Sequence, residues 1–466
     1  MSFQSASSNG LSGKELLFGT LRHESMPAVP WVPFAGVHAG KLAGYSATEV
    51  LKDAGKLVES LLAVNKVYGP DGQPVIFDLQ VEAEILGCDL VWAPSGPPTV
   101  ASHPLDSVME VPTRLPEPGD GRLPMILNTM REMKNCVGDR TALYGLICGP
   151  MTLASHLRGT EIFMDMFDHT DFLNELLAYS RDVALRMASL YLEAGMDVVA
   201  VVDPLVSQVS PRHFKQFLLK PFTDIFNDVR QAGAFSSFFV CGDATKNIEV
   251  MCQTGPDSIS VDENINLPQA KKITDRYNVT MGGNIPLTTR MLLGTQQDNM
   301  KFVVDLLDQL KDPELELQPG NFILAPGCDM PYDTPTENVV GALQAVRNPE
   351  GTRAMLANYE SRTFDIEVTL PDYEHLDKPL VEVFTLDSET CAACGYMMSA
   401  AQRAVSELGG EIELVEYKFT RPENIARVMK MGITNLPSLY INGELKFSSL
   451  IPSNRELLEE IRKSVK

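Results

Sequence analysis

Apolar residues between positions 171 and 195 recur at the spacing of a helix, and a short apolar run follows them. Phe172, Leu176 and Val183 belong to this pattern, which predicts an amphipathic helix. The run MDVVAVVD at 196–203 is typical of a strand that is buried on both faces. Similar runs return at 236–240, 258–261, 279–283 and 321–325, with helical stretches between them. Strands that alternate with helices predict a parallel sheet, so we expect an α/β barrel or a doubly wound sheet.

A second, smaller α/β pattern follows a break in this periodicity. Residues 351–378 lose the helical spacing and carry acids and prolines, as a linker or an edge segment does. Beyond them the predicted order is strand, helix, strand, helix, β-hairpin and helix, with the hairpin turning at Asn442-Gly443. The first helix opens with a C-x-x-C pair, Cys391 and Cys394, and Pro437 precedes the third strand. Because motif, order and size agree, this region resembles a thioredoxin-like domain.

Length, charge and cysteine content narrow the class of protein. A chain of 466 residues is too long for one ordinary core, so we expect a large domain at 1–350, a linker at 351–378 and a small domain at 379–466. The net charge of −22 argues against binding to nucleic acid or to anionic membranes. The polar start MSFQSASSNG does not read as a signal peptide, so we expect a cytoplasmic protein. In that setting the eight cysteines favour metal or redox roles over disulfide stapling.

Two cysteines occupy positions where a barrel places its chemistry. Cys241 and Cys328 each follow a strand-like run and precede a polar or proline-rich loop. In a parallel barrel both thiols therefore lie at the C-terminal mouth. Two converging thiolates suit a soft metal such as zinc. A pair of buried, inert cysteines fits the spacing equally well.

The first 350 residues resemble the uroporphyrinogen decarboxylase superfamily over nearly their whole length. The matching segments are VPFAGVHAGK, VIFDLQVEAEILG, GPMTLASHLRG, EAGMDVVAVVDPLVSQVSPRHFKQFLLKP, GGNIP and LAPGCDMPYDTPTENVVGALQAVR. Their order and spacing carry the resemblance, which implies a (β/α)8 TIM barrel with its site at the C-terminal ends of the strands.

Several residues point away from the decarboxylases within that superfamily. The segment that carries two arginines in decarboxylases reads Val37-His38-Ala39-Gly40-Lys41 here. His156 replaces the decarboxylase tyrosine, Cys328 replaces a late histidine, and Asp78 alone retains the acidic position. A site with few arginines in a strongly acidic chain is a poor host for a substrate with many carboxylates.

The same residues resemble the corrinoid methyltransferase branch, whose zinc pattern is H-x-C followed much later by a cysteine in P-G-C or T-G-C. Cys241 and Cys328 match both cysteines, but Phe239 stands where the histidine is expected and cannot bind a metal. A catalytic zinc needs about three protein ligands, so a third must come from elsewhere. His156 is the first candidate and His38 the second, and three acids are further candidates, Asp243, Glu82 and Glu84. Alternatively the metal is absent and the cysteines act as thiols or only pack.

Other site residues are also implied by the resemblance. Asp78, His156 and Asp203 would be catalytic, binding a polar substrate group or orienting a ligand, although Asp203 is equally well read as a helix cap. The remaining pocket residues would be His38, Glu82, Glu84 and Asn284.

The implied chemistry is methyl transfer to or from a corrinoid. A methyl group on cobalt(III) is electrophilic, and a zinc-bound thiolate is a strong nucleophile at neutral pH. The chain has no D-x-H-x-x-G motif, so we expect the cobalamin on a partner protein, with a small thiol or a methoxy or methylthio compound as substrate. The direction of transfer stays open. A decarboxylase-like lyase and a redox-responsive small-molecule binding protein are the alternatives.

The C-x-x-C pair implies thiol redox chemistry in the second domain. Cys391 would attack, since a helix N-terminus favours its thiolate, and Cys394 would resolve, with Pro437 facing them. Reduction of the barrel's cysteines is one use for such a pair. A degenerate docking domain and a metal clip are the alternatives.

Overall fold

A computed structural model describes most of the chain, and it divides into two units. The described residues are 10–311, 319–361, 366–388, 392–409, 412–433, 435–449 and 451–464. The first unit is Met1–Arg362 and the second is Thr363–Lys466. Among the described residues, no helix has both the length and the apolar character needed to cross a bilayer.

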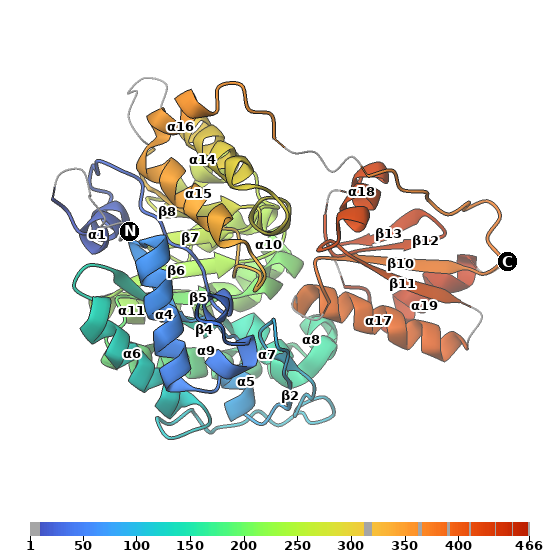
Figure 1. Cartoon of the computed structure of the whole chain (residues 1–466). Coiled ribbons are helices and arrows are strands. Elements are labelled where there is room, and N and C mark those ends of the chain that lie inside the picture. Colours follow the sequence, from blue (N-terminus) through green and yellow to red (C-terminus); the bar gives the residue numbers. More distant parts are fainter. Residues whose placement is uncertain are drawn as a thin grey trace. The chain divides into compact units, whose positions relative to one another are not determined.

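The first unit is built on a seven-stranded parallel sheet (Figure 1), with the strands in the order β1-β4-β5-β6-β7-β8-β9. Their bounds are β1 (Gly72–Ile76), β4 (Ala142–Cys148), β5 (Val198–Val202), β6 (Phe235–Val240), β7 (Ser258–Val261), β8 (Thr280–Ile285) and β9 (Phe322–Pro326). Apart from Phe235, every residue in them is buried, which explains why they read as continuous apolar runs rather than as alternating ones.

A single bridge closes the sheet into a barrel. Trp31 pairs in parallel with Leu324 of β9, and the Val32 amide donates to the Leu324 carbonyl at 2.9 Å. On its other side the Trp31 carbonyl accepts from the amide of Asp71, the residue before β1, at 2.9 Å. The predicted barrel class is confirmed, with its first strand reduced to this short segment.

Helices alternate with these strands, as predicted. The longer ones are α1 (Gly13–Leu21), α4 (Ala54–Tyr68), α6 (Leu123–Val137), α7 (Pro150–Arg158), α9 (Thr170–Glu193), α11 (Leu219–Gln231), α13 (Leu267–Arg276), α14 (Gln296–Leu310) and α15 (Thr336–Arg347). The shorter ones are α2 (His38–Ala43), α3 (Ala47–Val50), α5 (Val81–Ile85), α8 (Ile162–Asp168), α10 (Pro211–His213), α12 (Ile248–Cys252) and α16 (Pro349–Met355). Single turns are η1 (Gly159–Glu161), η2 (Pro204–Gln208), η3 (Phe214–Leu218), η4 (Thr245–Asn247) and η5 (Leu287–Leu292), and β2 (Leu90–Val91) pairs with β3 (Thr99–Val100).

Aromatic side chains fill the inside of the barrel below its mouth. The rings of Phe34 and Phe239 lie 4.8 Å apart, and those of Phe77 and Phe239 lie 5.7 Å apart. Cys241 and Cys328 pack against this cluster from the mouth side and are partly exposed. Residues two apart in a strand have side chains on the same face. Because the Phe239 side chain points into the barrel, the Cys241 side chain, two residues further along, points inward too.

The second unit is a four-stranded sheet in the order β11-β10-β12-β13. Its elements are β10 (Leu380–Thr385), α17 (Ala392–Leu408), β11 (Glu413–Lys418), α18 (Pro422–Lys430), β12 (Ser438–Ile441), β13 (Glu444–Ser448) and α19 (Asn454–Ser464). β10 pairs in parallel with β11 and antiparallel with β12, and one apolar cluster lies on each face of the sheet. This is the predicted order of strands and helices.

The stretch expected to link the domains is divided between the two units. The helix α16 lies in the first unit and packs against α14. Val368 and Tyr373 belong to the second unit and are hydrogen-bonded within it: the Tyr373 hydroxyl donates to Glu382 at 3.1 Å, and the Val368 carbonyl accepts from Lys430 at 2.6 Å. The expected linker at 351–378 therefore contains packed residues of both units.

Candidate functional site at the barrel mouth

Two cysteines meet at the C-terminal mouth of the barrel. Cys241 directly follows β6, Cys328 lies two residues beyond β9, and β7 and β8 separate these strands in the sheet. Their Sγ atoms nevertheless lie 2.6 Å apart. The structure thus brings together two thiols that are 87 positions apart in the chain, on the apolar floor that Phe239 helps to form.

Two cysteine thiols are the right type of ligand for zinc, but two are too few for a catalytic zinc site. Among the described residues, no group of three His, Cys, Asp or Glu side chains is arranged to hold a metal ion. Phe239, at the position of the expected histidine, is fully buried among aromatic rings. A zinc ion would therefore find two soft ligands among the described residues and would lack the third that a catalytic site requires.

His38 is engaged at both of its ring nitrogens. Nδ1 donates to the Tyr332 carbonyl at 3.0 Å, so the neutral Nε2 accepts from the Tyr68 hydroxyl at 2.7 Å. Burial lowers the pKa of His38 to about 4, which keeps the ring neutral at pH 7. In this arrangement His38 has no free lone pair for a metal, and its role as a ligand stays a prediction.

His156 lies in α7 and is also buried and neutral. Burial lowers the pKa of its imidazole to about 4. Its Nδ1 has no hydrogen-bond partner among the described residues, and its carbonyl accepts from the His103 ring at 2.8 Å. A ligand or a substrate proton would satisfy the unpartnered nitrogen, because buried polar atoms are rarely left unpaired.

Asp78 and Glu84 share one arginine that the sequence did not single out. Arg122 Nη1 donates to Asp78 at 2.7 Å, and its Nε donates to Glu84 at 2.6 Å. The side chain of Asp78 is fully buried, that of Arg122 is 10% exposed, and the guanidinium lies 4.9 Å from the Trp92 ring. No signal in the sequence pairs Arg122 with an acid 44 positions away.

Asp203 joins the end of β5 to the first turn of α7. Its carboxylate accepts from the Met151 amide at 2.9 Å and from the Thr152 hydroxyl at 2.6 Å. Burial raises its pKa to about 7, against the effect of these hydrogen bonds. Gly149 leaves room for this contact, since a Cβ at that position would collide with Asp203. The carboxylate therefore contacts the N-terminus of α7, the helix that follows β4.

The other predicted pocket residues hold the backbone at strand ends. Glu82 accepts from the Cys148 amide at 2.9 Å, and burial raises its pKa to about 7. Asn284 donates to the carbonyls of Asp262 and Ile265 at 2.9 and 3.0 Å, which fixes the loop after β7.

Three acids near the mouth are missing from the sequence-based set. Asp262 and Glu263 follow β7, and Asp329 follows Cys328. Asp262 is buried, and the other two are partly buried. Desolvation raises the pKa values of all three, to about 8 for Asp329, and the neighbouring Asp262 carboxylate raises that of Glu263 further. Asp329 accepts from the Gly36 amide at 2.7 Å, so it also fixes the loop before α2. Their position within three residues of a strand's C-terminal end was the signal that would have identified them.

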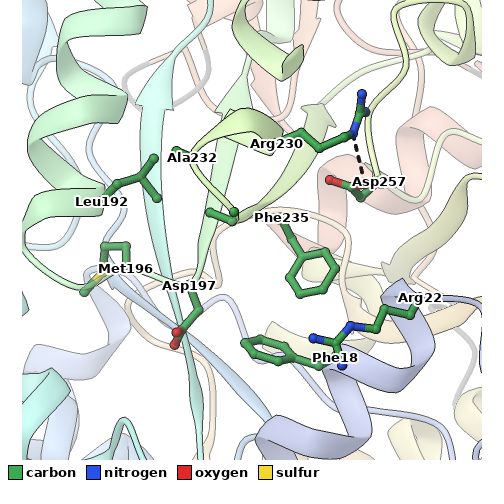
Figure 2. A pocket seen from close by; sticks show the side chains of 11 residues that line it. Phe18, Arg22, Leu192, Met196, Asp197, Arg230, Ala232, Phe235 and Asp257 are labelled. Atoms are coloured by element: carbon green, nitrogen blue, oxygen red, sulfur yellow. Dashed lines mark ion pairs between the residues drawn. The ribbon is translucent and has the colours of Figure 1, made fainter. Parts of the chain in front are cut away.

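A hollow of the first unit lies at the opposite end of the barrel (Figure 2). Its volume is about 420 Å³, and it is lined by residues at the C-terminal end of α1 and by residues that precede or begin β5 to β7. Arg22 lies 5.8 Å from the Phe18 ring and 5.7 Å from the Phe235 ring, while Arg230 pairs with Asp257 at 3.8 Å. The N-terminal end of a barrel ordinarily serves stability, so the chemistry belongs to the thiol end.

A closed parallel barrel with reactive side chains at the strand ends defines an enzyme of the TIM-barrel class. Residues 12–349 match the family described as uroporphyrinogen decarboxylase (URO-D), and residues 380–462 match a thioredoxin domain. The chain belongs to the uroporphyrinogen decarboxylase family, as its resemblance predicted, and the thioredoxin-like character of its second unit is confirmed.

The chain is similar to characterised methyltransferases along the barrel. It is 26% identical to the methylcobamide:CoM methyltransferase MtbA of Methanosarcina acetivorans, over 72% of this chain and 97% of that protein. It is 31% identical to MtaA, a protein of the same description from Methanosarcina barkeri, over 63% and 84%. A uroporphyrinogen decarboxylase of a Wolbachia is 23% identical over 65% and 84%. A solved methyltransferase from Methanosarcina mazei superposes with a TM-score of 0.65 at 24% identity, over 73% of this chain and 99% of that one, which supports the fold.

Proposed function

We propose that this protein is a corrinoid-dependent methyltransferase. It moves a methyl group between a corrinoid carried by a partner protein and a small thiol or methylated substrate. The observation that carries the proposal is the contact of Cys241 with Cys328 at the barrel mouth, in a chain whose relatives include methylcobamide:CoM methyltransferases. The cytoplasmic location expected from the sequence stays a prediction.

One buried imidazole of the chain can hydrogen-bond to a substrate. His156 is neutral, and its Nδ1 has no hydrogen-bond partner among the described residues. Because burial lowers its pKa to about 4, it is a weak base at pH 7, so we assign it a hydrogen-bonding role toward the substrate rather than that of a proton acceptor. Asp203 and Asp78 act as positioning residues, because Asp203 fixes the first turn of the helix that carries His156 and Asp78 holds Arg122.

The proposal extends to zinc as a bound metal. Cys241 and Cys328 are its two assigned ligands, and the third is still to be identified. Zinc bound to thiolates would keep a substrate thiol deprotonated at neutral pH.

Metal content tests this assignment most directly. Protein is purified under reducing conditions without chelator and compared with the Cys241→Ala/Cys328→Ala double variant. Cys136→Ala is the matched control, since Cys136 is an exposed lone thiol on α6. About one zinc per chain in the wild type and the control, and none in the double variant, is the expected result. Absence of zinc from the wild type would remove the metal from the proposal.

Methyl transfer itself is tested with free methylcobalamin in place of the partner protein. Coenzyme M is the first acceptor to try, because the relatives' names specify it. Loss of the methyl–cobalt absorption is expected with the wild type and not with the double variant. An equal rate in the two proteins, or no reaction with any thiol, would refute the proposed activity.

A further inference from the structure

The contact between Cys241 and Cys328 has a property that methyl transfer does not use. Their sulfur atoms lie 2.6 Å apart, and both cysteines are partly exposed to solvent. The strands that precede them are not neighbours, so a bond between these sulfurs would join two separated strand ends of the mouth. In the described part of the chain this is the one pair of cysteines in contact.

The other described thiols of the barrel are poor candidates for redox exchange. Cys88, Cys148 and Cys252 are buried, and burial raises their pKa values, to about 12 for Cys88 and Cys252. Thiolates react and thiols do not, so these three are inert at neutral pH. Cys136 is exposed on α6 and is not in contact with another described cysteine.

We propose that Cys241 and Cys328 form a reversible disulfide, and that the chain's own thioredoxin-like unit reduces it. The disulfide form has neither thiolates for a metal nor a thiol for the proposed reaction, so the barrel is inactive until it is reduced. The second unit then has a defined protein substrate within the same chain. Neither the family match nor the relatives' names assign this activity.

The electrons balance in both directions. Oxidation by a small-molecule disulfide, such as oxidised glutathione, joins the two sulfurs and releases two molecules of the small thiol. In reduction, the Cys391 thiolate attacks one barrel sulfur and releases the other as a thiolate. Cys394 then attacks Cys391, so the second barrel sulfur leaves and the C-x-x-C pair becomes the disulfide. A small dithiol in solution returns that pair to the reduced state.

Of the two cysteines in the C-x-x-C pair, the structure describes Cys394 and not Cys391. Cys394 is fully buried near the start of α17, where its sulfur accepts from the Leu386 amide at 3.3 Å. Cys391 lies outside the described residues, and its role rests on the C-x-x-C motif. A buried second cysteine is the arrangement expected of the resolving thiol, which must be sheltered from outside attack.

The first experiment oxidises chelator-treated full-length protein with oxidised glutathione, alkylates the remaining thiols and identifies linked peptides by mass spectrometry. A peptide joining Cys241 to Cys328 is expected in wild type and in Cys136→Ala, and it should disappear after treatment with dithiothreitol. In Cys328→Ala, Cys241 should instead carry glutathione. If both barrel cysteines remain alkylatable after oxidation, the proposed disulfide does not exist.

The second experiment traps the reducing step. Cys394→Ser keeps an acceptor for the Leu386 amide but removes the resolving thiol, so a linkage of Cys391 to Cys241 or Cys328 should accumulate. The Cys391→Ala/Cys394→Ser variant should show no such linkage. An intact barrel disulfide beside a free Cys391 would exclude the second unit as the reductant. Both readouts are covalent and need no corrinoid, so their failure would leave the proposed methyl transfer standing.

Discussion

Replacing Arg122 by methionine should destabilise the barrel strongly. Among the described residues, the substitution leaves the fully buried carboxylate of Asp78 with a single remaining partner, the Gln80 amide at 2.9 Å. Removing one member of a buried ion pair typically costs about 3–5 kcal/mol, because the other charge stays desolvated. Since the Gln80 hydrogen bond remains, we expect a loss of about 3 kcal/mol, the lower end of that range.

Two further variants separate the ion pair from the loss of packing. Glu84 also binds Arg122, but its side chain is 30% exposed, so Glu84→Gln should cost less than about 1 kcal/mol. The double variant Asp78→Asn/Arg122→Met removes both charges of the buried pair. It should therefore be more stable than Arg122→Met alone, because no unpaired buried charge remains.

The assay is urea unfolding followed by tryptophan fluorescence. The chain has two tryptophans, Trp31 and Trp92, and both belong to the first unit, so the signal reports the barrel alone. Because Trp92 contacts Arg122, each variant needs its own folded baseline. A free energy of unfolding for Arg122→Met within about 1 kcal/mol of wild type would refute the assigned role of the pair. So would a double variant no more stable than the single one.

Three other substitutions test the mouth. The Phe239→His variant should retain more zinc after dialysis than the wild type, because the histidine adds the third ligand. Its free energy of unfolding should be lower by about 1–3 kcal/mol, because a polar ring enters an aromatic cluster. An unchanged zinc content would contradict the first expectation. Burial raises the pKa of Asp203 from 3.8 to about 7, so its contribution to wild-type stability should be greatest below pH 4 and fall by at most about 4 kcal/mol as the pH rises to 7. Asp203→Asn should flatten that slope in urea midpoints measured against pH, and an equal slope would argue against the shift. Gly149→Ala should cost about 1–3 kcal/mol through collision with Asp203, whereas Gly119→Ala, where a Cβ meets open space, should be neutral by thermal unfolding.

The fold was predictable because its determinants are local. Buried parallel strands read as short apolar runs, and in a barrel their C-terminal ends share one mouth, so Cys241 and Cys328 were both expected there. Contacts between residues that are distant in the chain could not be predicted from the sequence. Arg122 meets Asp78 only after α6 is packed beside β1, and the engagement of both nitrogens of His38 depends on residues far along the chain. Which polar side chains are satisfied and which are left unpaired is a property of packing, and spacing alone does not contain it.

The way the barrel closes has a consequence for its synthesis. Trp31 cannot form its bridge until Leu324 has been synthesised. At about 5–20 residues per second, the ribosome needs roughly 15 to 60 s to extend the chain from Trp31 to Leu324. Throughout that interval the growing chain carries an open sheet edge beside β1. Nascent chains halted before β9 should therefore associate with chaperones or with one another, whereas chains long enough for β9 to have left the ribosome should not. The last strand, β9, therefore determines when the barrel can close, and it also positions Cys328 at the mouth.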